Sequence, residues 1–360
     1  MKNSYLTAGI TLPRLIRLLG RNKISLHPKY LLRTGFLLQS AFWSSICAFF
    51  ENARYRKKIR SVPVPSDIIF IIGHWRTGST FLHQMMAQDT QFACPTLFQV
   101  ALPDHFISSY HYFRPVMLVS MSKHRPMDNV KIGMNEPQED EYAIYRITDY
   151  SPLEKIVFPV SDRYFLKDLK DWIPSKDCIG KWEKEVVDFF RKLYFLNRKT
   201  IVSKNPFNSM RIPELHSMFP SARFIHIHRH PFDVVPSTIQ MWDIVQQQNA
   251  LNGNGGRPDL EEVADVLEQM LTCIRRDSAL LPEGSFHEVC FERLEKDPAG
   301  TIKELYGFLG IAFTEGTREK LEGFLKSVSN YRKNNYDLSG TEKDLIRQKL
   351  SHHMSRYGYN

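Results

Sequence analysis

Residues 68–82 limit most strongly what this chain can fold into. Ile68 to Ile72 are five consecutive apolar residues, β-branched or aromatic, and they predict a buried strand of an α/β sheet. Gly73 and Gly78 predict a turn, and apolar residues then recur at helical spacing at Phe81, Leu82, Met85 and Met86. A helix that starts near Gly78 gathers backbone N–H groups around one point, where its dipole also favours an anion. The stretch therefore predicts a phosphate-binding loop.

This loop differs from the nucleotide loop of kinases and ATPases. Their loop reads GxxxxGK[ST], with a lysine directly after the second glycine. Here Ser79 follows Gly78, and the only cation of the turn, Arg76, lies before that glycine. The loop therefore lacks the lysine that a kinase uses to bridge phosphates. A tight strand-to-helix turn without a ligand is the plainer alternative.

Arg76-Thr77-Gly78-Ser79-Thr80 resembles the 5′-phosphosulfate loop of sulfotransferases. These enzymes take a sulfonate from 3′-phosphoadenosine 5′-phosphosulfate (PAPS), and they carry a [K/R]-[S/T]-G-[S/T]-T core after a hydrophobic strand. The resemblance implies that the donor's 5′-phosphosulfate is bound by Gly73, Arg76, Thr77, Gly78, Ser79 and Thr80.

A second sulfotransferase motif follows a predicted core strand at residues 222–228. Arg229 lies at the end of that strand, where open α/β sheets bind ligands, and Ser237 lies in the first turns of the next predicted helix. In sulfotransferases an arginine and a serine with this eight-residue spacing hold the 3′-phosphate of PAPS. The resemblance assigns that role to Arg229 and Ser237, whereas an ion pair of Arg229 with Asp233 is the purely structural alternative.

Two further segments extend the resemblance. Lys204 follows a short predicted strand at residues 200–203 and matches the family lysine that approaches the transferring sulfonate. Residues 289–298 resemble the family's strand with a YEDL-type turn, in which Glu292 is expected to be structural. The family's C-terminal glycine-rich phosphate loop is not visible, and residues 331–334 are the candidate substitute. The matched segments run from about residue 67 to 311.

The general base is where the chain departs from the family pattern. Cytosolic sulfotransferases commonly place a histidine two residues after the lysine, but Pro206 occupies that position here. The acid-rich segment 135–143 resembles the PxEDE-like segment of the bacterial branch, which implies that Glu139 is the base. Asp140 or Glu141 and then His105 are the next candidates, and His105 and Asp140 are also candidates for contact with the acceptor. Alternatively, the acids form a solvated helix N-terminus that Pro137 opens.

Length and composition suit one large α/β domain with insertions. Of the 360 residues, 42% are hydrophobic and 24% are charged, as in ordinary globular proteins. We expect an N-terminal helical arm at residues 1–60, a core at 61–315 with a helical insertion at about 150–200, and a tail at 316–360 that packs on the core. The formal charge of +9 suits an anionic ligand, a nucleic acid or an anionic membrane. No basic run interleaved with aromatics favours a nucleic acid, so the nucleotide donor is the simpler partner.

Residues 34–50 are the nearest approach to a membrane segment, although no stretch reaches the ~18 apolar residues that span a bilayer. Polar residues interrupt this segment, so a helix packed against the domain is the favoured interpretation. The alternative is an interfacial helix, supported by the basic residues Arg14, Arg17, Arg21 and Lys23 upstream. The five scattered cysteines predict neither disulfides nor a zinc site and suit a reducing compartment. We therefore expect a cytoplasmic protein, with peripheral membrane contact as the alternative.

These observations predict a three-layer, P-loop-like α/β sulfotransferase with a mainly parallel central sheet flanked by helices. The sulfonate would pass from PAPS to an acceptor hydroxyl, leaving 3′-phosphoadenosine 5′-phosphate. Arg76 and Lys204 would neutralise the developing charge, so no metal is expected. Abundant aromatic residues favour a lipophilic alcohol such as a sterol or lipid. The alternatives are a small-molecule kinase or other ATP-using enzyme, and a nucleotide-binding protein without catalysis.

Overall fold

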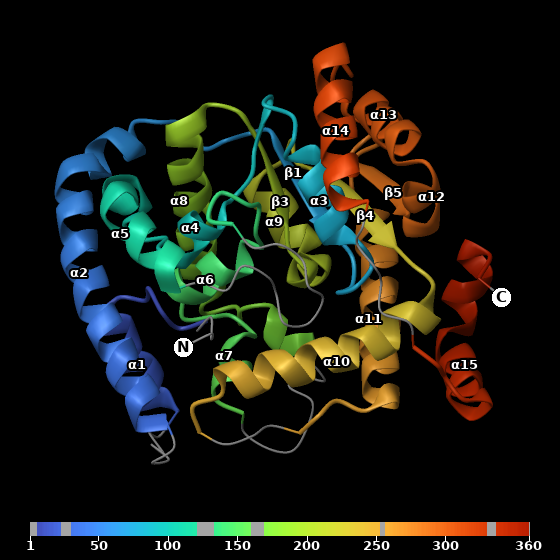
Figure 1. Ribbon diagram of the computed structural model, residues 1–360, viewed down its shortest axis with the longest axis horizontal. Helices are drawn as coiled ribbons and strands as arrows, with labels where there is room; N and C mark the ends of the chain where they lie inside the picture. Colours follow the sequence, from blue (N-terminus) through green and yellow to red (C-terminus); the bar gives the residue numbers. More distant parts are fainter. Residues whose placement is uncertain are drawn as a thin grey trace. The chain divides into compact units, whose positions relative to one another are not determined.

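The computed structural model describes residues 6–22, 30–120, 133–159, 169–252, 256–329 and 336–359 (Figure 1). The chain forms two compact units. Unit 1 consists of Met1–Val64, Pro95–Leu196 and Met241–Pro258. Unit 2 consists of Pro65–Cys94, Asn197–Gln240 and Asp259–Asn360.

A sheet of five parallel strands forms the centre of unit 2, in the order β2-β3-β1-β4-β5. The strands are β1 (Ile68–Ile72), β2 (Phe92–Ala93), β3 (Thr200–Lys204), β4 (Arg223–His228) and β5 (Phe286–Cys290). Every residue of β1 is buried, as expected of a central parallel strand covered on both faces. The predicted parallel α/β sheet is therefore confirmed.

Helices cover both faces of this sheet, so unit 2 has three layers. On one face Ile69 and Ile71 join an apolar core formed with α3 (Ser79–Met86), α12 (Phe291–Lys296), α13 (Pro298–Leu309) and α14 (Glu315–Val328). On the other face the ring of Phe70 lies 6.0 Å from that of Phe219, which directly follows α9 (Ile212–Met218). The 3₁₀ helix η3 (Pro206–Met210) and α11 (Leu260–Ser278) also pack there, and α15 (Gly340–Tyr357) packs against α11.

The strand register brings three chain segments to one edge of the sheet. Ile71 pairs with Lys204, the last residue of β3, and Ile72 pairs with His226 of β4. The carboxyl ends of β1, β3 and β4 are therefore neighbours, at the edge where open α/β sheets bind ligands. The segments that leave these ends begin with Gly73, Asn205 and Arg229.

The C-terminal part of the chain covers the polar face of β4. The alternation along this strand predicts that one of its faces is more polar than the other. His226 and His228 do share a face, but both are buried. Tyr357 stacks on His228 with 3.8 Å between ring centroids, and its hydroxyl donates to Glu288 Oε1 at 2.7 Å. Burial lowers the pKa of His228 to about 4, so this histidine is neutral at physiological pH.

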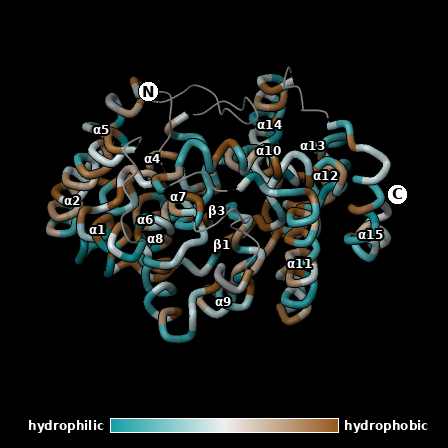
Figure 2. Tube along the Cα trace, turned by 90° about the horizontal axis from the view of Figure 1, so that it is seen from below, coloured by the Kyte–Doolittle hydropathy of each residue, from teal (hydrophilic) through white to brown (hydrophobic). Residues whose placement is uncertain are grey.

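Unit 1 is helical in its described residues (Figure 2). Large side chains of α8 (Ile179–Asn197) recur every three or four residues on its buried face, including Trp182, Phe189 and Phe190. The helix α10 (Pro231–Asn249) begins in unit 2 and ends in unit 1. The other helices described in unit 1 are α1 (Leu12–Arg21), α2 (Leu31–Arg60), α4 (Leu97–Ala101), α5 (Phe106–Ser120), α6 (Glu141–Ile147), α7 (Glu154–Val157) and η2 (Leu169–Trp172).

Candidate active site

Two glycines allow the loop after β1 to pack closely on its neighbours. Gly73 has φ 134°, and a Cβ atom there would lie 2.4 Å from the carbonyl oxygen of Ile227 in β4. Gly78 has φ 91°, and a Cβ atom there would lie 2.1 Å from Cδ2 of Phe291. Any other residue would force the loop away from β4 or from α12. Both glycines are therefore required by the fold itself.

Hydrogen bonds hold the loop in one conformation. Ser209 Oγ accepts from the Gly73 N–H at 2.9 Å and donates to the Gly73 carbonyl oxygen at 3.2 Å. Thr77 Oγ1 donates to the His74 carbonyl oxygen at 2.7 Å. Arg76 lies between Gly73 and Thr77 in the chain and has φ 67°, a left-handed conformation that is costly for a residue with a side chain. Such strain is typical of functional loops that the surrounding structure holds in place.

The loop is connected to α10 through Arg76. Its Nε donates to Ser237 Oγ at 2.8 Å, although the two residues are 161 positions apart in the chain. Tyr336, which precedes α15, donates its hydroxyl proton to Gln240 Oε1 at 2.7 Å, and the same hydroxyl lies 3.3 Å from Ser237 Oγ. No pattern in the sequence indicated Tyr336, and the nearest signal was the neighbouring segment 331–334, which lies outside the described residues.

Arg229 lies beside the same loop. Its Nη1 donates to the Arg76 carbonyl oxygen at 3.5 Å, and its guanidinium lies 4.5 Å from the centre of the Phe291 ring. The ion pair with Asp233 that we weighed as a structural alternative is also formed, at 2.9 Å. The Asp233 side chain is half-exposed, so this pair contributes little stability.

Lys204 is a buried cation next to the start of α3. Its residue is 3% exposed, and its Nζ donates to Thr80 Oγ1 at 3.3 Å. His83 lies close to it and donates from Nε2 to the Val202 carbonyl oxygen at 3.1 Å. Burial, with the positive charge of Lys204 as a second cause, lowers the pKa of His83 to about 3. His83 is therefore neutral, and Lys204 supplies the positive charge there.

Together these contacts bring positive charges and hydrogen-bond donors together at the end of β1. The structure connects Arg76 with Ser237 and Arg229, and Lys204 with Thr80. The N–H groups in the first turn of α3 have no partners within the helix, so they can bind anionic oxygens. Among the described residues, no group of three His, Cys, Asp or Glu side chains could hold a metal ion.

The acid-rich segment belongs to unit 1, and its predicted helix start was wrong. Pro137 does not open a helix but forms an antiparallel bridge with Thr96. The helix α6 begins at Glu141, and both Asp140 and Glu141 are fully buried instead of solvated. The Glu141 carboxylate accepts from Ser151 Oγ at 2.7 Å. Glu139 is half-buried, so it is the most accessible of the three consecutive acids.

His105, also in unit 1, has the features of a buried structural histidine. It is fully buried, and its Nδ1 lies 2.7 Å from Ser109 Oγ. Burial lowers its pKa to about 4. Because a buried imidazole has no exposed face for a substrate, this environment weakens the candidacy of His105 as a base.

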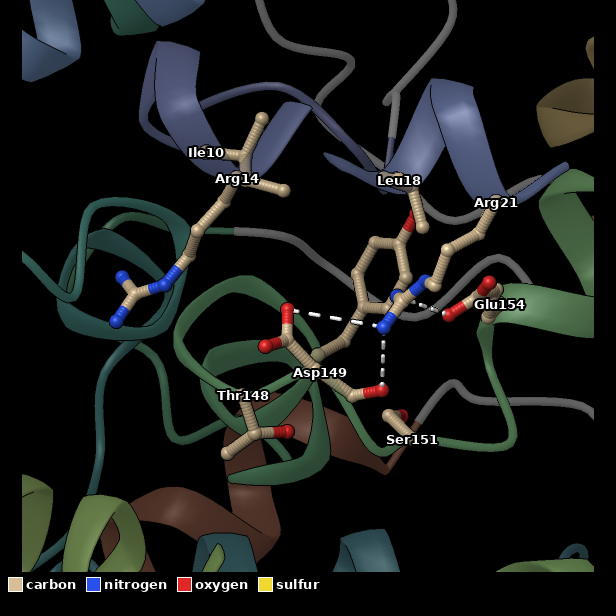
Figure 3. A pocket seen from close by; sticks show the side chains of 9 residues that line it. Ile10, Arg14, Leu18, Arg21, Thr148, Asp149, Ser151 and Glu154 are labelled. Atoms are coloured by element: carbon tan, nitrogen blue, oxygen red, sulfur yellow. Dashed lines mark hydrogen bonds and ion pairs between the residues drawn. The ribbon is translucent and has the colours of Figure 1, made fainter. Parts of the chain in front are cut away.

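A small hollow in unit 1 is shown in Figure 3. Arg21 closes one side by donating to Glu154 Oε2 at 2.8 Å and to the Asp149 carbonyl oxygen at 3.2 Å. The cavity volume of about 10 Å³ holds roughly one water molecule. The hollow is therefore too small for a substrate.

Comparisons with known proteins lead to one family. Residues 67–315 match the sulfotransferase family. The omega-hydroxy-beta-dihydromenaquinone-9 sulfotransferases of Mycobacterium bovis and Mycobacterium tuberculosis are 29% identical over 360 residues, which cover 99% of this chain and 91% of theirs. A Mycobacterium avium sulfotransferase structure has a TM-score of 0.61 at 14% identity, covering 97% of this chain and 86% of its own. A sulfotransferase structure from Mycobacterium tuberculosis has a TM-score of 0.61 at 16% identity, covering 96% of this chain and 88% of its own. These structures confirm the fold.

The low pKa of His83 predicts how stability changes with pH. An unfolded histidine binds a proton below about pH 6.5, whereas folded His83 stays neutral down to about 3. The free energy of unfolding should therefore decrease as pH falls through this window, by up to about 1.4 kcal/mol per pH unit for this residue. In His83→Gln, whose amide can still donate to the Val202 carbonyl oxygen, the free energy of unfolding measured with urea should depend less steeply on pH, by that amount. An unchanged dependence on pH would contradict the low pKa of His83.

Proposed function

Because this chain belongs to the sulfotransferase family, we propose that it transfers a sulfonate from PAPS to a lipid hydroxyl. The observation that carries the proposal is the gathering of Arg76, Lys204 and Arg229 around one strained glycine loop. The loop has no lysine after Gly78, which disfavours a kinase.

The residues of unit 2 would share the work of binding and charge stabilisation. The N–H groups of Thr77 to Thr80 would hold the 5′-phosphosulfate, because they lie at the start of α3 where the helix dipole favours an anion. In the transfer, the acceptor oxygen bonds to sulfur, the bond from sulfur to the phosphate oxygen breaks, and the acceptor's proton passes to a base. Arg76 and Lys204 would stabilise the negative charge that develops on the departing phosphate oxygen.

We propose Glu139 as that base. Pro206, which stands where a histidine is common, has no side-chain group that accepts a proton. Glu139 is half-buried, whereas Asp140 and His105 are fully buried. A partly exposed carboxylate can reach an acceptor hydroxyl and still return its proton to water.

The proposed acceptor class is a lipid alcohol. The mycobacterial relatives are named for a hydroxylated dihydromenaquinone, and they align with nearly the whole chain. A lipid acceptor resides in a membrane, so an enzyme that uses it would work in contact with the membrane surface. Sulfur-labelled PAPS supplied with membrane lipid extracts, followed by mass spectrometry of the labelled product, would identify the acceptor.

Arg76→Ala is expected to lower kcat by at least ~10²-fold, the scale for removing one preorganised donor to the transition state. Sulfonate transfer is measured with sulfur-labelled PAPS and a long-chain alcohol. Arg198→Ala is the matched control, because Arg198 also has a left-handed φ, of 54°, but is exposed and lies outside the loop. An Arg76→Ala enzyme with undiminished kcat and unchanged Tm would exclude this role for Arg76.

Glu139→Gln keeps the side-chain shape but cannot accept the proton. We expect kcat to fall ~10²- to 10⁴-fold while PAPS affinity changes little. Glu136→Gln, in the same acid-rich segment, is the matched control and should retain activity. If Glu139→Gln stays active while folded His105→Ala is inactive, His105 is the base and the proposal for Glu139 is wrong.

Replacing both Arg229 and Ser237 by alanine should abolish the preference for PAPS over adenosine phosphosulfate, which lacks the 3′-phosphate. Each charge-assisted hydrogen bond contributes roughly 1.5–3 kcal/mol, so losing Arg229 alone should weaken PAPS binding ~10- to 100-fold. Binding of adenosine phosphosulfate should hardly change, and calorimetry with both ligands measures the difference.

The control for this pair is Asp233→Ala, which removes the ion-pair partner of Arg229 and keeps the arginine. This variant should keep the preference for PAPS. If the double variant of Arg229 and Ser237 retains the wild-type preference, these residues do not bind the 3′-phosphate.

A further inference from the structure

The helix α2 turns small residues inward and large apolar residues outward. Its buried residues alternate at three- and four-residue spacing, which defines one face of a helix. These residues are mostly small or polar: Thr34, Leu37, Ala41, Ser44, Ala48 and Glu51. The usual amphipathic pattern, with large apolar residues facing the core, is therefore reversed.

Contacts within unit 1 fix this orientation of α2. Ser45 Oγ accepts from the Leu12 N–H at 2.7 Å, next to the start of α1. Farther along, the buried Glu51 accepts from the Ser108 N–H at 2.6 Å and forms an ion pair with Lys192 of α8. Rotating the outward side chains into the protein would leave the Lys192 charge buried and unpaired, which is strongly unfavourable.

The outward face carries eight large hydrophobic side chains. At 100° per residue they centre on the side of the helix opposite the buried row. The most exposed are Leu32 at 82%, Phe49 at 69% and Phe50 at 63%. The others are Leu31, Phe36, Leu38, Phe42 and Trp43. An apolar surface this extended on one element indicates an interaction site, and the hydropathy along α2 can be followed in Figure 2.

A cluster of positive charges continues this surface toward the end of α2. Five exposed basic residues occupy its last two turns: Arg54, Arg56, Lys57, Lys58 and Arg60. The only acid of α2 is Glu51, which faces inward. An apolar, aromatic face continued by cations matches a bilayer surface with anionic headgroups. No helix in the described parts of the chain is long and apolar enough to cross a membrane.

We propose that the outward face of α2 docks on the surface of an anionic lipid bilayer. The aromatic side chains insert at the headgroup level, and the basic cluster contacts the anionic headgroups. A second copy of the chain fits this face less well, because α2 presents no outward acid to pair with its cations. Docking on the bilayer does not depend on the proposed function. Only a faster turnover of a lipid acceptor by the docked enzyme would rest on that function.

Sedimentation with phosphatidylcholine vesicles, with and without phosphatidylglycerol, tests the proposal in the absence of PAPS and acceptor. The full chain should bind the anionic vesicles, and raising the salt concentration should weaken binding. The double variant Phe49→Gln with Phe50→Gln should bind at least ~10-fold more weakly. Its matched control is Leu196→Gln with Leu280→Gln, which replaces two exposed leucines elsewhere and should bind as the wild type does.

The charge contribution has its own pair of variants. Lys57→Gln with Lys58→Gln should weaken binding to anionic vesicles about fivefold per charge. Lys320→Gln with Lys326→Gln changes the net charge equally on α14 and should have a much smaller effect.

Three results would overturn the docking proposal. They are absence of binding to anionic vesicles, full binding by the Phe49 and Phe50 variant, and a dimer in light scattering that this variant abolishes. The last result would assign the face to a second copy. Turnover of a short, water-soluble alcohol tests the sulfotransfer separately, so failure of either proposal can be recognised on its own.

Discussion

The parallel pairing of β1 with β3 and β4 is the constraint on which unit 2 depends. β1 is buried along its whole length and contributes side chains to both apolar layers, so it cannot shift without disrupting both. Its register places the end of β3 beside Ile71 and the end of β4 beyond Ile72. The positions of Lys204 and Arg229 at one edge follow from this pairing alone. The loop after β1 adds the hydrogen-bonding groups.

Phe291 shows how packing and charge are combined at that edge. Its ring lies where a Cβ of residue 78 would be, and the Arg229 guanidinium lies over the same ring. The ring supports the loop and also holds a cation close to it through a cation–π contact. The strained backbone of Arg76 is stable only because contacts of this kind, with those of Ser209 and Ser237, determine the loop from several sides.

Local pattern was enough to predict the three central strands β1, β3 and β4 and the glycine turn after β1, whereas the short edge strand β2 was not predicted. The run Ile68–Ile72 and the glycines that follow carry their structural meaning within one short segment. The helix start expected in the acid-rich segment was wrong, because Pro137 pairs with the distant Thr96 instead of opening a helix. Tyr336 and Tyr357 could not be found from sequence either. Their roles depend on the path of the C-terminal segment back to α10 and β4, which no local pattern specifies.

The register of the sheet also limits where residues can be inserted into this chain or deleted from it. Because side chains alternate between the faces of a strand, inserting or deleting one residue within β3 would exchange the faces of Ser203 and Lys204. The cation would then leave the side of the sheet on which it meets Thr80. Length variation is therefore compatible with this architecture in the connecting segments, whereas each central strand has to keep its residue count even where its apolar residues are exchanged.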